Sequence, residues 1–128
     1  MIPVLSVLRA SVGLSLRPAL AFLTTLLLVA CAQTTATAPV ATDQVDLPKS
    51  YRFAPANIAV AVGTTVTWTN NDNFTHSVRL LDGDEPPLMM KPGEQVTHAF
   101  PAAGTYQYDC SLHPKDMKGS VVVEAGSG

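Results

Sequence analysis

Residues 104–117 read GTYQYDCSLHPKDM and decide how the chain is interpreted. Tyr106, Tyr108 and Cys110 alternate with two polar residues, and this period of two predicts a half-buried β-strand. The strand follows a turn that runs from Pro101 to Gly104. Tyr106 either forms a tyrosine corner, in which the phenol bonds back to nearby backbone, or is simply a core residue at the start of a strand.

The rest of residues 50–125 shows the same alternation. Further strands are expected at 58–62, 65–69, 77–80, 96–100 and 121–123, separated by turns rich in Gly, Pro, Asn and Asp. No stretch has the periodicity of an amphipathic helix, and no internal repeat is present. Six or seven short strands with turns at this spacing predict an all-β, Greek-key β-sandwich.

The residues after the Tyr106 strand carry candidate metal ligands. A thiol, an imidazole and a thioether lie within eight residues, at Cys110, His113 and Met117. His76 lies 34 residues before Cys110, at the start of a predicted strand. Two histidines and a thiolate with a weak axial thioether are the ligand set of blue copper sites. The four residues therefore predict one type 1 copper ion.

Each of these residues has a simpler explanation when it is taken alone. A single free cysteine in a strand is usually an inert, buried apolar residue, and a methionine is often a core filler. The combination argues against these explanations, because an exported free thiol is open to oxidation and metal ligation protects it.

Residues 51–124 resemble the plastocyanin-like cupredoxins. The resemblance rests on Phe53-Ala54-Pro55, on VTWTN at 66–70, on 72–76, and on 104–110 with the following His113-Pro114. It implies a Greek-key sandwich with copper at one end, held by His76, Cys110, His113 and the axial Met117. It also implies that the protein carries single electrons between larger redox proteins. The chain departs from the plastocyanin pattern at Ser77, where asparagine is usual, and the loop from His113 to Met117 belongs to a region of variable length.

The N-terminal segment has the composition of an export signal. No acidic residue precedes Asp43, and the apolar stretch Ala19–Ala30 is too short for a membrane span of about 20 residues. Residues 1–30 are therefore predicted to be a signal peptide. The sequence LVAC at 28–31 resembles a bacterial lipobox, which implies lipidation of Cys31 and a membrane anchor. The alternative is ordinary cleavage and release of a soluble protein that starts at Gln33.

The remaining boundaries follow from composition. Residues 31–49 are rich in Ala and Thr and are expected to be a flexible, lipid-anchored linker, with a reach of about 20–25 Å. Residues 50–125 form the expected domain, and residues 126–128 form a tail.

Three other groups of residues are candidates for a role near the metal site. His98 shares a strand face with Val96 and is expected to be structural. Met89 and Met90 are expected to pack in a loop around the ligands, although a copper-loading role is conceivable. The acidic residues Asp82, Asp84 and Glu85 are either a solvated turn or a patch that steers a basic partner.

The net charge and the motifs of the chain argue against two classes of function. After residue 30 the chain has six basic residues minus ten acidic residues, which gives −4 and argues against nucleic-acid binding. No nucleophile–base pair or phosphate loop is present, so we expect no enzyme. The expected function is an extracytoplasmic, periplasmic electron shuttle, a monomer that meets a cytochrome, an oxidase or a dehydrogenase transiently. The alternatives are a periplasmic copper chaperone with the same ligands, and a structural sandwich without copper.

Overall fold

The computed structural model describes residue 13 and residues 37–126. The predicted signal peptide and Cys31 lie outside these residues, apart from Gly13. Nine strands form within the described part of the chain: β1 (Val40–Ala41), β2 (Gln44–Leu47), β3 (Asn57–Ala61), β4 (Thr65–Asn70), β5 (His76–Leu80), β6 (Leu88–Met90), β7 (Gln95–Ala99), β8 (Gly104–Asp109) and β9 (Lys118–Glu124). None of the described residues belongs to a helix long and apolar enough to cross a membrane.

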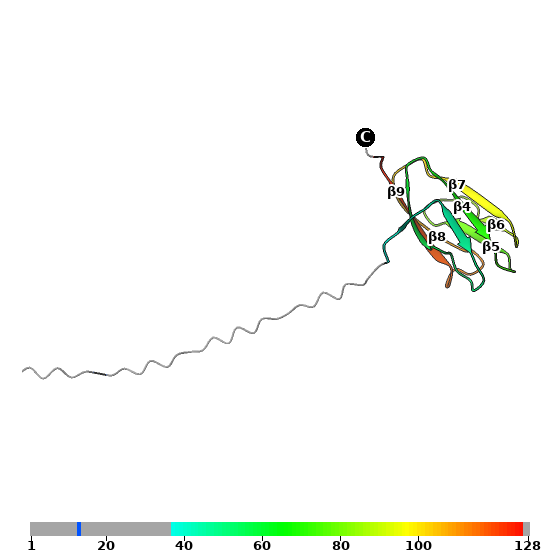
Figure 1. The fold of residues 1–128 in the computed structure, drawn as a ribbon, viewed down its shortest axis with the longest axis horizontal. Coiled ribbons are helices and arrows are strands. Elements are labelled where there is room, and N and C mark those ends of the chain that lie inside the picture. The colour runs from blue at the N-terminus through cyan, green and yellow to red at the C-terminus, as the bar shows by residue number, and fades with distance from the viewer. Residues whose placement is uncertain (1–12, 14–36, 127–128) are drawn as a thin grey trace, which may run out of the picture. The chain divides into compact units, whose positions relative to one another are not determined.

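The strands form two sheets (Figure 1). The larger sheet has the order β1-β3-β9-β8-β5-β6, and the smaller sheet has the order β2-β4-β7. Neighbours in each sheet come from distant parts of the chain: β3 pairs with β9 in parallel, and β5 pairs with β8. The prediction of an all-β sandwich is confirmed.

The core lies between the sheets and is made of the inward residues of each alternating strand. Ile58, Val66 and Val121 are each fully buried. The largest buried side chains are aromatic: Trp68, Tyr108 and Phe100. Phe53 packs edge-on against Tyr108, with ring centroids 4.8 Å apart. Aromatic side chains are therefore the largest components of the core between the sheets.

The predicted linker is wrong for residues 40–49. β2 pairs in parallel with β4, with Val45 opposite Trp68, and it buries Val45 and Leu47. β1 pairs in parallel with β3. Gln44, Val45, Asp46 and Leu47 do alternate between polar and apolar, but four residues after an Ala- and Thr-rich stretch give a weak signal. The domain therefore begins by residue 40 and not at residue 50.

Strand β6 and the Tyr106 corner are two smaller features for which an expectation came from the sequence. Residues 88–90 form β6, where a loop was expected, and pair with the start of β5. The tyrosine corner is confirmed, since the Tyr106 hydroxyl donates to the carbonyl oxygen of Ala102 at 2.8 Å.

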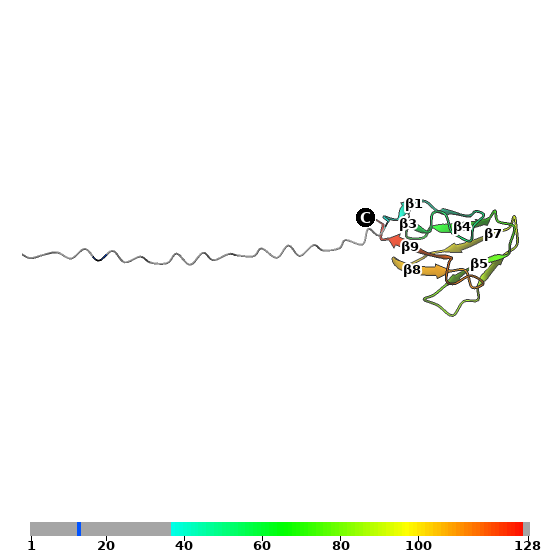
Figure 2. The ribbon, with the colours of Figure 1, turned by 90° about the horizontal axis from the view of Figure 1, so that it is seen from below.

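Strand direction brings the candidate ligands to one end of the sandwich. β8 ends next to Cys110 and β9 runs antiparallel to it, so their arrowheads point to opposite ends (Figure 2). β5 pairs antiparallel with β8 and begins at His76, at the end where β8 finishes. β4 and β6 also finish at this end, since Met90 lies opposite His76 and the Gly93 amide bonds to Asn70. We refer to it as the site end.

Candidate metal centre

Three of the four predicted ligands meet at the site end. Ligand atoms of His76, Cys110 and His113 all lie within 4.8 Å of one another. The Cys110 Sγ atom is 3.9 Å from His76 Nδ1 and 3.7 Å from His113 Nδ1. His76 and Cys110 are fully buried, whereas His113 is half-buried.

These separations fit a single metal ion. Donors about 2.0–2.3 Å from one ion, at roughly 120° to one another, lie about 3.5–3.9 Å apart. Both Sγ–Nδ1 distances are close to this range. Thiolate sulfur and imidazole nitrogen are softer donors than carboxylate oxygen, and copper accepts a thiolate with two imidazoles. The residues present therefore fit copper.

A buried carboxylate orients His76. The Asp72 Oδ2 atom lies 2.9 Å from His76 Nε2, and both side chains are buried. An ionised carboxylate only accepts hydrogen bonds, so the imidazole proton belongs on Nε2 and Nδ1 keeps its lone pair for a metal. The hydrogen bond from His76 lowers the pKa of Asp72 below its usual value, against the opposing effect of burial.

Asn70 holds the loop that presents this pair. Its buried side chain donates from Nδ2 to the carbonyl oxygens of Phe74 and Met90, at 2.8 and 3.1 Å. Its Oδ1 accepts the Asp72 amide at 3.0 Å. A single amide side chain therefore ties the loop after β4 to the end of β6 and fixes Asp72.

Ser77 contacts the Cys110 sulfur, and Ser111 contacts Ser77. The Ser77 amide donates to Sγ at 3.3 Å, and the Ser77 hydroxyl lies 3.7 Å from the same atom. The Ser77 hydroxyl also accepts the Ser111 amide at 2.8 Å and lies 2.8 Å from the Ser111 hydroxyl. Hydrogen bonds to a thiolate favour its charged form. The serine at position 77 thus contacts the sulfur where an asparagine was expected from the resemblance.

Backbone hydrogen bonds close the loop from Cys110 to Met117. The Cys110 amide donates to Met117 and the Met117 amide donates to His113, both at 3.0 Å. The Met117 side chain is buried. The loop therefore holds the thioether residue beside the other three residues without strand pairing.

An ion pair lies next to the thiol. Arg79 on β5 donates from Nε and Nη2 to both carboxylate oxygens of Asp109, at 2.8 and 2.7 Å. This bidentate bond raises the pKa of Arg79. Asp109 is buried although its parity on the strand predicted exposure, because Arg79 provides its partner across the sheet.

Tyr51 covers the two histidines from the turn after β2. Its ring lies edge-on to His113 with centroids 4.7 Å apart, and edge-on to His76 at 5.8 Å. It stacks on Phe74 at 5.6 Å. Ser50 and Tyr51 have φ values of 99° and 50°, a conformation that costs about 1–2 kcal/mol per residue.

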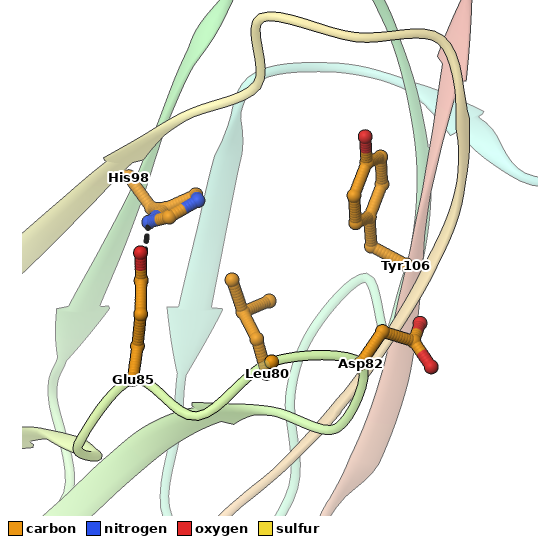
Figure 3. A pocket seen from close by; sticks show the side chains of 6 residues that line it. Leu80, Asp82, Glu85, His98 and Tyr106 are labelled. Carbon is orange, nitrogen blue, oxygen red and sulfur yellow. Dashed lines mark ion pairs between the residues drawn. The ribbon is translucent and has the colours of Figure 1, made fainter.

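His98 lies outside the metal-binding group. Its Nδ1 atom is 3.7 Å from the Glu85 carboxylate, beside a pocket of about 180 Å³ that Leu80 and Tyr106 also line (Figure 3). Its ring packs edge-on against Phe100 at 4.8 Å. Met90 is buried opposite His76, whereas Met89 is half-exposed.

Sequence analysis missed several residues that support the site. Tyr51 lies in the predicted domain without a role, and Asp72 enters only as part of the 72–76 segment that carries the resemblance. The spacing of Asp72 and His76, four residues apart, was the available signal. No periodicity points to Tyr51, because its position depends on a turn with positive φ.

Comparison with known proteins agrees with this geometry. The model of the copper-binding plastocyanin/azurin family matches residues 40–124. Plastocyanin from Scenedesmus fuscus is 35% identical over 85 residues, covering 56% of this chain and 86% of that protein. Amicyanin-alpha from Methylorubrum extorquens is 35% identical over 92 residues, covering 68% and 76%. The purple cupredoxin from Nitrosopumilus maritimus superposes with a TM-score of 0.54 at 33% identity, covering 63% of this chain and 98% of that structure.

Proposed function

The chain belongs to the plastocyanin/azurin family of copper-binding proteins, and we propose that His76, Cys110, His113 and Met117 hold one type 1 copper ion through which it transfers single electrons. The observation that carries this proposal is the convergence of two imidazole nitrogens and one sulfur within 4.8 Å. Copper, when bound, supplies a one-electron couple between Cu(II) and Cu(I).

The protein side chains hold the donors in one arrangement for both oxidation states. Asp72 fixes the His76 ring, the Ser77 amide fixes the sulfur, and Tyr51 packs against the His113 ring. Donors that are already held in place need little rearrangement when the charge of the site changes.

His113 is the point at which a partner can approach. It is half-buried, whereas the other imidazole is fully buried. Exposed apolar side chains surround it: Leu112 is 50% exposed and Phe74 is 54% exposed. Small apolar contact areas suit brief redox encounters. The docking of a cytochrome, an oxidase or a dehydrogenase here remains a proposal.

Electron transfer is favoured over catalysis and over copper delivery. Four protein donors leave no open position for a substrate, which argues against an enzyme. Three of the four donor residues, His76, Cys110 and Met117, are fully buried, which favours retained copper over rapid exchange with a delivery partner.

The test is a visible absorption spectrum of the purified chain after one equivalent of Cu(II). We expect an intense thiolate-to-copper band that ascorbate bleaches and an oxidant restores. Cys110→Ala should abolish the band, and His98→Ala, which changes a histidine outside the group, should retain it. A blue Cys110→Ala protein would contradict the ligand assignment.

We further propose that the protein is exported and anchored through lipidated Cys31. The support is the sequence LVAC at 28–31 after a short apolar stretch. Expression in a bacterium with labelled fatty acid should label the wild type and leave Cys31→Ser unlabelled. Equal labelling of both would contradict lipidation, and an unlabelled protein that begins at Gln33 would indicate ordinary cleavage.

A further inference from the structure

The charged side chains of the domain are separated between its two ends. Four exposed cations, Lys49, Arg52, Lys115 and Lys118, lie within two residues of Tyr51, His113 or Met117. A fifth, Lys91, follows Met90, which lies opposite His76. We call these five cations the basic rim. None of them forms an ion pair with a described carboxylate, whereas the sixth cation, Arg79, is paired with Asp109.

Few negative charges oppose the basic rim. Glu94 and Asp116 are the exposed carboxylates at the site end, and partly buried Asp46 accepts a hydrogen bond from Asn71. Asp72 is buried against His76. The surface around His113 therefore carries a positive charge, although the residues after position 30 sum to −4.

The opposite end is acidic. β5 runs away from His76 into the loop that contains Asp82, Asp84 and Glu85. Asp82 and Glu85 of this loop are seen in Figure 3. Glu124 ends β9 opposite Ala61, and Asp43 precedes β2. No described Lys or Arg lies at this end. Five strand residues span about 16 Å, which exceeds the Debye length of about 8 Å at physiological ionic strength. A partner at His113 is thus screened from the acidic loop.

We propose that the basic rim and the apolar residues around His113 form a docking surface for a redox protein with a carboxylate-rich surface around its own electron-transfer site. The inference rests on the proposed function and adds the charge of the partner. The separated charges orient the molecule during approach, because opposite local potentials steer encounter and like potentials repel the wrong end. The sequence left open a basic partner steered by Asp82, Asp84 and Glu85, but these residues lie in the loop after β5, beyond the strand end that is opposite to His76.

The experiment measures oxidation of the reduced, copper-loaded chain by two probes of opposite charge. The probes are hexacyanoferrate(III), an anion, and tris(phenanthroline)cobalt(III), a cation. Between about 0.05 and 0.3 M salt, where the Debye length is at most about the length of a strand, the rate with the anion should fall and the rate with the cation should rise. The negative net charge of the domain, taken alone, predicts that added salt raises the rate with the anion and lowers the rate with the cation.

Matched variants locate the effect. The triple variant Lys91→Gln, Lys115→Gln, Lys118→Gln should slow the anionic oxidant about tenfold at low salt. The control Asp82→Asn, Asp84→Asn, Glu85→Gln removes three negative charges at the other end, a change in net charge of equal size and opposite sign, and should change either rate by less than about twofold. Larger effects from the control than from the lysine variant would overturn the proposal.

Other outcomes distinguish a failure of the docking-surface proposal from a failure of the proposed electron-transfer function. A blue protein whose rates follow its net charge would overturn the docking surface and leave electron transfer intact. A protein without the thiolate-copper band would overturn both. Binding to phosphatidylglycerol vesicles, with equal salt responses to the two oxidants, would overturn the proposal and assign the basic rim to a lipid surface.

Discussion

Asp72 controls the electron density of the His76 imidazole. Its carboxylate accepts the Nε2 proton in a buried setting, where such a bond is strong. A more basic imidazole stabilises Cu(II) more than Cu(I), because the higher charge gains more from a better donor. The carboxylate is therefore expected to hold the reduction potential down.

Asp72→Asn tests this role. Asparagine keeps the shape and a neutral acceptor, so the fold should survive, while Cu(II) affinity should fall about 10–100-fold. If Cu(I) affinity is unchanged, the potential should rise by about 60 mV for each tenfold loss. Competition titrations for both oxidation states, with voltammetry, measure all three quantities. Asp116→Asn, an exposed change in the ligand loop, should have little effect. An unchanged potential in the Asp72 variant would refute the argument.

Ser77 acts on the other side of the centre, at the sulfur. Ser77→Ala removes the hydroxyl near Sγ and keeps the amide donor. A thiolate with fewer hydrogen bonds donates more strongly, so the potential should fall, by roughly 20–40 mV for a long hydrogen bond of about 0.5–1 kcal/mol. Ser111→Ala, which leaves its amide donating to Ser77, is the control and should shift the potential less. A rise in potential for Ser77→Ala would contradict this role.

The residue types of the centre were predictable, and its supporting contacts were not. Cys110, His113 and Met117 are close in sequence, so their spacing along the chain is enough to group them. Asp72 and Tyr51 act through side-chain directions that depend on the Asn70 hydrogen bonds and on a turn with positive φ. These depend on tertiary structure, and alternation along a strand carries no information about them.

At the scale of elements, β2 decides whether residues 40–49 belong to the domain. Leu47 is fully buried, and Leu47→Ala should lower the free energy of unfolding by about 2–4 kcal/mol, because it leaves a cavity in the core. Val40→Ala, at an exposed residue of β1, should cost less than about 0.5 kcal/mol. Urea denaturation measures both. Equal, negligible effects would restore the flexible linker that composition suggested.

Strand prediction succeeded where strands are long and alternate regularly. β3, β4, β5, β7, β8 and β9 each have five or more residues, and all six were anticipated within a few residues of their ends. β1, β2 and β6 have two to four residues and were missed. Such short strands exist because partners such as β3, β4 and β5 are already in place, which local sequence does not reveal.

Gly119 on β9 is required by the close approach of two other elements. A Cβ atom there would overlap the Ala56 carbonyl oxygen and the Tyr108 ring, whose hydroxyl donates to that same oxygen at 2.8 Å. Gly119→Ala should therefore destabilise the domain by about 2–4 kcal/mol, since backbone or a buried ring must move. Gly83→Ala is the matched control, because its nearest neighbour is 4.0 Å away. Thermal unfolding of both variants measures the difference, and equal midpoints would contradict the contact.

At the scale of the whole molecule, most of the core is made of residues that are not candidate ligands, although Cys110 and Met117 join it. Trp68, Phe100 and Ile58 fill the space between the sheets, whereas the ligands lie at the site end and are held by hydrogen bonds within the protein. A fold that depended on metal would need the ion to bring its strands together. Here β8 and β9 pair over six residues through backbone hydrogen bonds, which use no candidate ligand side chain. We therefore expect the metal-free protein to keep its β-sheet structure and a buried Trp68.

We therefore expect copper to raise the free energy of unfolding only by binding to a protein that is already folded. A ligand that binds the folded state alone adds about 4 kcal/mol at a thousandfold excess over its dissociation constant, or a rise in Tm of about 15–30 °C for a domain of this size. Calorimetry of the metal-free and the Cu(I)-loaded protein measures this rise, and circular dichroism and Trp68 fluorescence report the metal-free fold. Cys110→Ala should fold without metal and lose most of the rise. An unfolded metal-free wild type would show that the ligands and the core form one cooperative unit, and an undiminished rise in the Cys110 variant would place the copper elsewhere.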